Sequence, residues 1–165
     1  MLIIGFAGYS KAGKDEAARG LPPFFKRAAF ADALKVDVAR TFEVTLEELE
    51  RDKETYRPEL IAHGCACRAR DPLHWIKRIR LPESESIAIT DVRYREEAEF
   101  IQSLGGKVIY ILRPDYDPAH PEERRSIADL LSAGIINGVI INDGTIEELH
   151  ERACRLGCSP KAAAS

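Results

Sequence analysis

Residues 8–14 read Gly8-Tyr-Ser-Lys-Ala-Gly13-Lys14 and match the pattern Gly-x4-Gly-Lys. The apolar run Leu2–Ala7 precedes this stretch directly, and a short helix-forming segment, Asp15–Arg19, follows it. Glycines let the backbone curl so that successive N–H groups point at phosphate oxygens, and the following helix start adds positive potential. We therefore predict a phosphate-binding loop in which Lys14 reaches the β and γ phosphates of a nucleotide and Lys11 adds charge at the rim.

Five short apolar runs along the chain predict strands. The runs are continuous in hydrophobicity rather than alternating, which indicates burial on both faces and is typical of a parallel sheet covered by helices. Together with the loop they predict an α/β P-loop NTPase fold, with a five-stranded parallel sheet covered by helices on both faces. The predicted strands are Leu2–Ala7, Arg27–Phe30, Ile87–Thr90, Val108–Leu112 and Val139–Ile141.

Helix signals fill the gaps between these runs. One segment, Ala31–Phe42, carries apolar residues at four-residue spacing, and another, Arg95–Leu104, stops at a pair of glycines. Two Thr-x-x-Glu capping boxes and one Asp-Pro pair predict further helix starts. They begin at Thr45, Thr145 and Asp71.

The length and composition favour one domain without a membrane span. The chain has 165 residues, 45% hydrophobic and 31% charged, and a net charge of −3, which argues against a broad electrostatic grip on nucleic acid. No apolar run approaches the ~20 residues that cross a bilayer, and Met1–Ala7 lacks the basic leader of a secretory signal, so we expect a cytoplasmic protein. We predict one kinase domain over 1–160, with a helical substrate-binding insert (31–86), a lid-like segment (113–126) and a disordered tail (161–165).

The four cysteines, Cys65, Cys67, Cys154 and Cys158, form two close pairs. Their Cys-x-Cys and Cys-x3-Cys spacings do not match the usual zinc patterns. We expect reduced thiols that act as small buried hydrophobic side chains.

Acidic and basic residues near the loop suggest how a nucleotide would be handled. Asp15 stands where P-loop proteins usually carry a Ser or Thr that ligates Mg²⁺, and it either holds the ion or caps the helix. Asp91 ends the third strand, where an acid orients the magnesium shell, unless it caps the next helix. Arg93 and Arg95 follow and either bind phosphate or pair with nearby glutamates.

Six segments, taken in order, resemble the phage-type deoxynucleoside monophosphate kinases of the P-loop kinase superfamily. The resemblance runs from about Leu2 to Glu151, and the loop is its most specific part. Glu16 departs from it, because members usually carry Thr at that position. The segments are Gly8-x4-Gly-Lys-Asp15, Phe30-Ala-Asp-Ala-Leu-Lys35, Tyr56-Arg-Pro-Glu-Leu-Ile61, Asp71-Pro-Leu-His-Trp75, Thr90-Asp-Val-Arg-Tyr94 and Ile141-Asn-Asp-Gly-Thr145.

The resemblance implies transfer of the γ-phosphoryl group of ATP, with Mg²⁺, to a (deoxy)nucleoside 5′-monophosphate. ATP would contact Gly8, Lys11, Ala12, Gly13, Lys14, Asp15, Glu16 and Asn142. The catalytic group would be Lys14, Asp91, Arg93 and Arg124, with Asp15 and Asp91 as metal ligands. The acceptor would contact Asp32, Lys35, Arg57, Arg68 and Trp75, although the arginines could instead form surface ion pairs and Trp75 could belong to the core.

Two alternatives remain open at this point. The acceptor could be another small phosphorylated metabolite such as dephospho-coenzyme A, which would require a carboxylate base near the transfer point. The chain could also be a nucleotide-binding module without transferase activity, which the departure at Glu16 keeps open. The expected partners are ATP and a nucleoside monophosphate, with no stable nucleic-acid partner, no membrane, and a homodimer as one candidate assembly.

Overall fold

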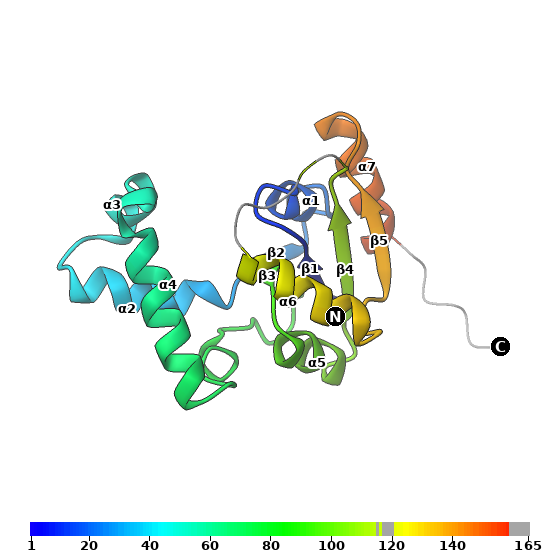
Figure 1. The fold of residues 1–165 in the computed structure, drawn as a ribbon. Coiled ribbons are helices and arrows are strands. Elements are labelled where there is room, and N and C mark those ends of the chain that lie inside the picture. The colour runs from blue at the N-terminus through cyan, green and yellow to red at the C-terminus, as the bar shows by residue number, and fades with distance from the viewer. Residues whose placement is uncertain (115, 117–120, 159–165) are drawn as a thin grey trace. The chain divides into compact units, whose positions relative to one another are not determined.

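The central strand of the molecule is β1 (Ile3–Ala7), and all five of its residues are buried. It lies in a five-stranded sheet of order β2-β3-β1-β4-β5 whose strands are all parallel (Figure 1). The predicted fold class is confirmed by this computed structural model, which describes residues 1–114, 116 and 121–158. The other strands are β2 (Phe25–Ala28), β3 (Ser86–Val92), β4 (Lys107–Leu112) and β5 (Gly138–Ile141).

The second strand lies two residues earlier than predicted. The apolar run Arg27–Phe30 suggested its position, but β2 is an edge strand that pairs only with β3, and it exposes Lys26 and Arg27. An edge strand needs no continuous apolar run, because one side of it faces solvent. Ala29 and Phe30 are buried outside the sheet, where the chain turns into the next helix.

Four helices accompany the sheet in the same part of the chain. They are α1 (Lys14–Arg19), α5 (Arg95–Ser103), α6 (Pro121–Ser132) and α7 (Ile146–Gly157). Helix α1 packs against α7, and α5 packs against α6. One hydrophobic cluster joins Phe6 and Ile111 of the sheet to Ala17 of α1 and Leu149 of α7, so the strands and both helices share a core.

Most helix ends that the sequence predicts from capping residues and glycines are present in the structure. The capping boxes at Thr45 and Thr145 are both formed, and α5 stops before Gly105, whose φ is 75°. The helix start predicted at Asp71 is wrong. Asp71 instead ends the preceding helix, and its carboxylate accepts the N–H of Leu73 at 3.0 Å. An aspartate whose carboxylate accepts the N–H of the residue two positions later forms a turn. Here the turn is followed by a short 3₁₀ helix, Ile76–Arg78.

The chain separates into two compact units, one made of Met1–Ala28 with Leu81–Ser165 and the other of Ala29–Arg80. The first holds the sheet and is called here the α/β unit; the second is called the helical unit. The helical unit contains α2 (Ala31–Thr41), α3 (Leu46–Arg51) and α4 (Lys53–Arg70). Its buried side chains include Leu34, Val38, Leu49 and Trp75.

A charged cluster ties α2 to the end of the helical unit. The Asp37 carboxylate accepts two hydrogen bonds from the Arg78 guanidinium, one of them at 2.8 Å, and lies 3.6 Å from His63 Nε2. The Arg78 guanidinium also lies over the Trp75 ring, 5.5 Å from its centre. The Trp75 indole N–H donates to the carbonyl of Gly64 at 3.3 Å. Residues 41 positions apart along the chain therefore hold this unit together.

The cysteines differ from the expectation of buried thiols. Cys65, Cys67 and Cys154 are half-buried and Cys158 is exposed. All four are free thiols, and the sulfur of Cys154 in α7 lies 3.5 Å from that of Cys158, the residue that follows the helix. In the described residues, no helix combines the length and apolar character that crossing a membrane requires.

Candidate nucleotide site

The loop between β1 and α1 is curled by residues with positive φ. Gly8 has a φ of 147° and Gly13 a φ of 103°. A Cβ atom at Gly8 would lie 2.7 Å from the carbonyl oxygen of Ile111, so neither the dihedral nor the space admits a side chain there. Lys11 adopts a φ of 61°, which continues the curl between the two glycines. The stretch predicted from the sequence as a phosphate-binding loop therefore has the required backbone path.

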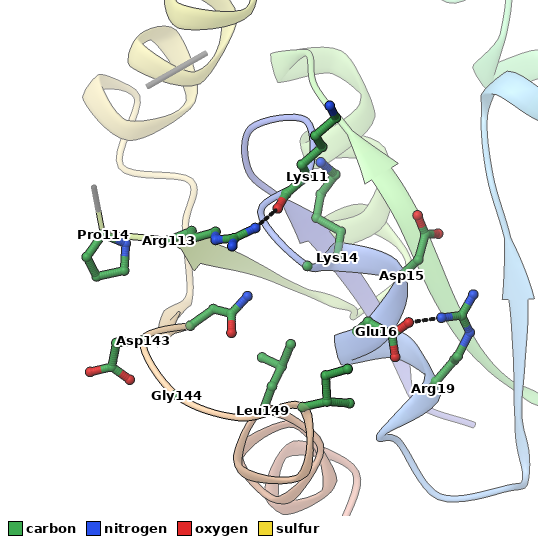
Figure 2. A pocket seen from close by; sticks show the side chains of 13 residues that line it. Lys11, Lys14, Asp15, Glu16, Arg19, Arg113, Pro114, Asp143, Gly144 and Leu149 are labelled. Carbon is green, nitrogen blue, oxygen red and sulfur yellow. Dashed lines mark hydrogen bonds and ion pairs between the residues drawn. The ribbon is translucent and has the colours of Figure 1, made fainter. Parts of the chain in front are cut away.

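Neighbouring strand ends hold this loop in place. The side-chain amide of Asn142, just past β5, donates to the carbonyl of Ala12 at 2.8 Å. The Arg113 guanidinium, just past β4, donates to the carbonyl of Lys11 at 3.0 Å and points toward it in Figure 2. Both contacts come from the carboxyl ends of strands, where ligands bind in open α/β sheets. Asn142 was predicted from the sequence as an ATP contact, whereas the positioning contact of Arg113 was not predicted.

Lys14 is the most buried charged group of the loop. Its side chain is 8% exposed, and its Nζ donates to the carbonyls of Gly8 at 2.8 Å and Tyr9 at 2.7 Å. Burial lowers the pKa of Lys14 to about 8, and the nearby Arg93 guanidinium contributes in the same direction. Three carboxylates raise the pKa of Lys14 and so oppose this shift; they are Glu123, Asp15 and Asp91. All of these charges therefore act on one ammonium group.

A cavity of about 760 Å³ opens beside the loop (Figure 2). This volume lies within the range of small-molecule sites. Apolar side chains of α7 form one wall, and the loop with the start of α1 forms another. The lining residues are Lys11, Gly13, Lys14, Asp15, Glu16, Arg19, Arg113, Pro114, Asn142, Asp143, Gly144, Ile146 and Leu149.

The two acids after Lys14 have different surroundings. The Asp15 carboxylate is largely exposed and lies 3.9 Å from Arg27 Nε. The Glu16 carboxylate forms an ion pair with Arg19 and lies 3.2 Å from Nε2 of His150 on α7. Glu16 therefore links α1 to α7 at the cavity edge, which gives the residue in the usual Thr position a structural role. Its contact with ATP stays a prediction.

Asp91 and Arg93 flank the end of β3. Asp91 lies within the strand, which runs two residues beyond its predicted end, and is half-buried. Arg93 is exposed, and its backbone N–H donates to the Glu97 carboxylate at 2.8 Å. Glu97 is buried and also accepts the N–H of Tyr94 at 3.1 Å, so it fixes the turn that presents Arg93. Glu97 was expected only as an ion-pair partner of the arginines, although an acid three residues after the residue that precedes a helix is the signal for this backbone contact.

The first turn of α6 contributes a residue that the sequence did not point to. Glu123 accepts the backbone N–H of Ser10 in the loop at 2.7 Å. Arg124, predicted to act on the phosphates, is the next residue and is exposed. Part of the predicted lid-like segment, 115 and 117–120, and the tail 161–165 lie outside the described residues.

The predicted acceptor residues all belong to the helical unit. Lys35 forms an ion pair with Glu50 and lies 3.8 Å from Asp32, so it joins α2 to α3. Trp75 is 3% exposed and packs in the core, so its ring is not free to stack on a base. This placement favours the core interpretation of Trp75.

The two predicted acceptor arginines are not brought together. Arg57 and Arg68 lie on α4, eleven residues or about 16 Å apart along the helix axis. The Arg57 guanidinium lies 3.1 Å from Glu54, one turn toward the helix start and away from Arg68. Arg68 packs near Gly64, where an added Cβ would lie 3.2 Å from its Nη1. The two arginines therefore lie on separate turns of one helix, and their contact with the acceptor stays a prediction.

The strand order and the curled Gly-x4-Gly-Lys loop define a P-loop NTPase fold. No family model matches the chain. It is 29% identical over 187 aligned positions to a protein of Acanthamoeba polyphaga mimivirus named "Putative deoxynucleotide monophosphate kinase", covering 92% of this chain and 94% of that protein. The resemblance seen in the sequence to deoxynucleoside monophosphate kinases is thereby confirmed.

Two solved structures align over nearly the whole chain at low identity. A shikimate kinase from Aquifex aeolicus shares 12% of residues with a TM-score of 0.45, covering 92% of each chain. A sugar kinase from Janibacter sp. shares 15% with a TM-score of 0.43, covering 93% of this chain and 92% of that one.

Proposed function

We propose that this protein transfers the γ-phosphoryl group of ATP to a (deoxy)nucleoside 5′-monophosphate, giving the diphosphate and ADP. The observation that carries the proposal is the buried ammonium of Lys14 inside a glycine-curled loop that borders a cavity of about 760 Å³. The mimivirus relative, whose name specifies a deoxynucleotide monophosphate, supports this acceptor class.

The base of ATP would occupy the cavity beside the loop. Leu149 and Ile146 offer an apolar wall, and the planar Arg113 guanidinium offers a surface on which a base can stack. Asn142 is held by the carbonyl of Ala12 and would line the edge of this space. The triphosphate would then run along the loop toward Lys14.

The loop and its charges would perform the transfer. Lys14 would leave the carbonyls of Gly8 and Tyr9 and neutralise the β and γ phosphates, while backbone N–H groups hold their oxygens. Arg93 would hold phosphate near the transfer point. The acceptor is already a phosphate dianion, so positioning and charge neutralisation matter more than a strong general base.

Asp15 and Asp91 would hold a magnesium ion. Both are carboxylates, the donors that Mg²⁺ prefers, and both act electrostatically on the ammonium of Lys14. Among the described residues, no three His, Cys, Asp or Glu side chains gather as a metal site. This suits Mg²⁺, which usually takes one or two carboxylates together with substrate phosphates and water. When bound, the ion would neutralise charge that develops on the phosphates.

The acceptor phosphate would bind in the helical unit. Arg57, Arg68, Asp32 and Lys35 remain the candidates, because guanidinium groups bind phosphate bidentately. Since Arg57 and Arg68 are separated along α4, we propose that one of them carries the main contact. Single alanine variants would identify it, because the KM of the acceptor rises for the residue that binds and stays unchanged for the other.

The test is ADP release measured with each deoxy- and ribonucleoside monophosphate, and with dephospho-coenzyme A as an alcohol acceptor. The proposal expects turnover with one or two monophosphates and none with the alcohol. Turnover only with the alcohol would contradict it, and ATP binding without any acceptor-dependent turnover would identify a nucleotide-binding module. Lys14→Ala should lower turnover severely. Lys107→Ala, which changes an exposed lysine at the far end of β4, should leave turnover unchanged.

A further inference from the structure

Helix α6 places a carboxylate on an amide of the phosphate loop. Glu123 Oε1 accepts the N–H of Ser10 at 2.7 Å in a half-buried setting, across 113 positions of sequence. Ser10 is the third residue of the loop. Backbone N–H groups of such a loop are the donors that phosphate oxygens accept from. The Glu123 carboxylate thus accepts a backbone N–H of a loop that we propose binds the phosphates of ATP.

The position of Glu123 along the expected triphosphate follows from the cavity. The cavity lining includes the loop from Lys11 onward and the start of α1, whereas Ser10 and Glu123 lie outside it. Glu123 nevertheless acts on the Lys14 ammonium, and among the carboxylates it has the largest effect on that group. A nucleotide whose base fills the cavity would therefore reach Glu123 with its last phosphate and not with its first.

Resting on the proposed function, we propose that Glu123 takes the place of the terminal phosphoryl group when ATP is absent and so makes the loop discriminate between ATP and ADP. The γ-phosphoryl group of ATP must displace the carboxylate from Ser10, because one N–H cannot serve two anions that repel each other. ADP ends one phosphate earlier and leaves the contact between Glu123 and Ser10 intact. The carboxylate therefore weakens ATP binding and spares ADP.

The rest of α6 is suited to such a movement. Ile127 and Leu130 are buried and anchor the helix, whereas the residues of its first turn are exposed or half-buried. The hydroxyl of Ser126 donates to the carbonyl of Glu123 at 3.2 Å, which stabilises that turn. A rotation of the Glu123 side chain, or a shift of the first turn, would free Ser10 without unpacking the helix.

The experiment compares the Kd values of ATP and ADP, with Mg²⁺ present, for the wild-type chain and for Glu123→Gln. Glutamine keeps the size and an oxygen acceptor but removes the charge. We expect ATP to bind roughly tenfold more tightly and ADP to change less than twofold, because only ATP meets the carboxylate. Glu122→Gln, in the same helical turn, makes the same change in net charge and should leave both affinities unchanged. Glu123→Ala, which removes the contact altogether, should reproduce the selective effect.

Each result decides the matter. An equal change for ATP and ADP, no change for either, or weaker ATP binding by Glu123→Gln would overturn the role given to Glu123. The wild-type chain tests the proposed function separately. If the wild-type chain binds neither ATP nor ADP, the loop is not a nucleotide site. Hydrogen exchange gives a second readout, since ATP but not ADP should raise exchange at the Ser10 amide or in the first turn of α6.

Discussion

The α/β unit and the helical unit differ in the surroundings of their predicted functional residues. In the α/β unit, Asp15, Asp91 and Arg93 all act electrostatically on the ammonium of Lys14. In the helical unit, Lys35 and Arg57 lie in local ion pairs and Trp75 is buried. The difference teaches that a motif acting through its backbone can be read from local sequence, whereas a site made of side chains on separate helices cannot.

The largest expected effect breaks the α/β side of this comparison. Lys14→Ala should lower kcat by roughly a thousandfold, because the ammonium is the buried cation of the loop. Circular dichroism and the unfolding midpoint should show that the variant stays folded. Lys107→Ala serves as the control, and an active Lys14→Ala enzyme would remove the loop from the mechanism.

The next effect tests whether Trp75 belongs to the core of the helical unit. Trp75→Ala should lower the free energy of unfolding by about 3–5 kcal/mol, because a buried indole and its bond to Gly64 are lost. Trp75→Phe keeps a ring and should cost less. Chemical denaturation measures both variants. A Trp75→Ala chain with unchanged stability but weaker acceptor binding would return this residue to the site.

A smaller effect concerns the pair formed by Asp37 and Arg78. Arg78→Ala should lower the free energy of unfolding by about 1–2 kcal/mol, a modest value because the guanidinium is open to solvent. Hydrogen bonds from Arg78 hold the pKa of Asp37 below its usual range. The stabilisation is therefore complete above the unfolded pKa and is lost as pH falls through the lower folded value.

The measurement for this pair is unfolding at pH 6 and at pH 3. The wild-type chain should lose part of the contribution of Asp37 at pH 3, and Arg78→Ala should lose less on acidification. Asp37→Asn serves as the matched variant without a titrating group. Equal acid sensitivity in all three chains would contradict the pairing.

The smallest effect is the pH dependence of nucleotide binding. The pKa of Lys14 in the free protein is about 8, so the ammonium that meets the phosphates is lost as pH rises through that value. The Kd of ATP should rise by up to about tenfold per pH unit above it, with proton uptake on binding. Calorimetry in buffers of different ionisation enthalpy measures the uptake. Lys14→Arg stays charged in this range and should show neither effect.

The same group has an opposite influence on the free protein. Between pH 8 and the ordinary lysine value of 10.5, the unfolded chain binds more protons at Lys14 than the folded chain does. The contribution of this group to stability therefore rises with pH in that window. ATP binding and the contribution of Lys14 to stability should thus respond in opposite directions as the pH rises above 8.

Several parts of the molecule were predictable because their cause is local. The loop, both capping boxes and the stop at Gly105 each depend on residues within a few positions of one another. The position of β2 was predicted two residues too late, because its pairing partner β3 lies far along the chain. A helix start was predicted at Asp71, where the side chain instead accepts the N–H of Leu73 in a turn. Glu123 and Arg113 could not be linked to the loop from sequence, since more than 100 positions separate the contacting groups.

The sequence by itself determined the parallel sheet and the position of the phosphate loop, because apolar runs and glycine dihedrals act over short stretches of chain. Only the tertiary structure decided which charges surround Lys14, what holds Glu16, and that Trp75 is a core residue. Those outcomes depend on burial and on through-space electrostatics, and both arise only when distant segments pack together.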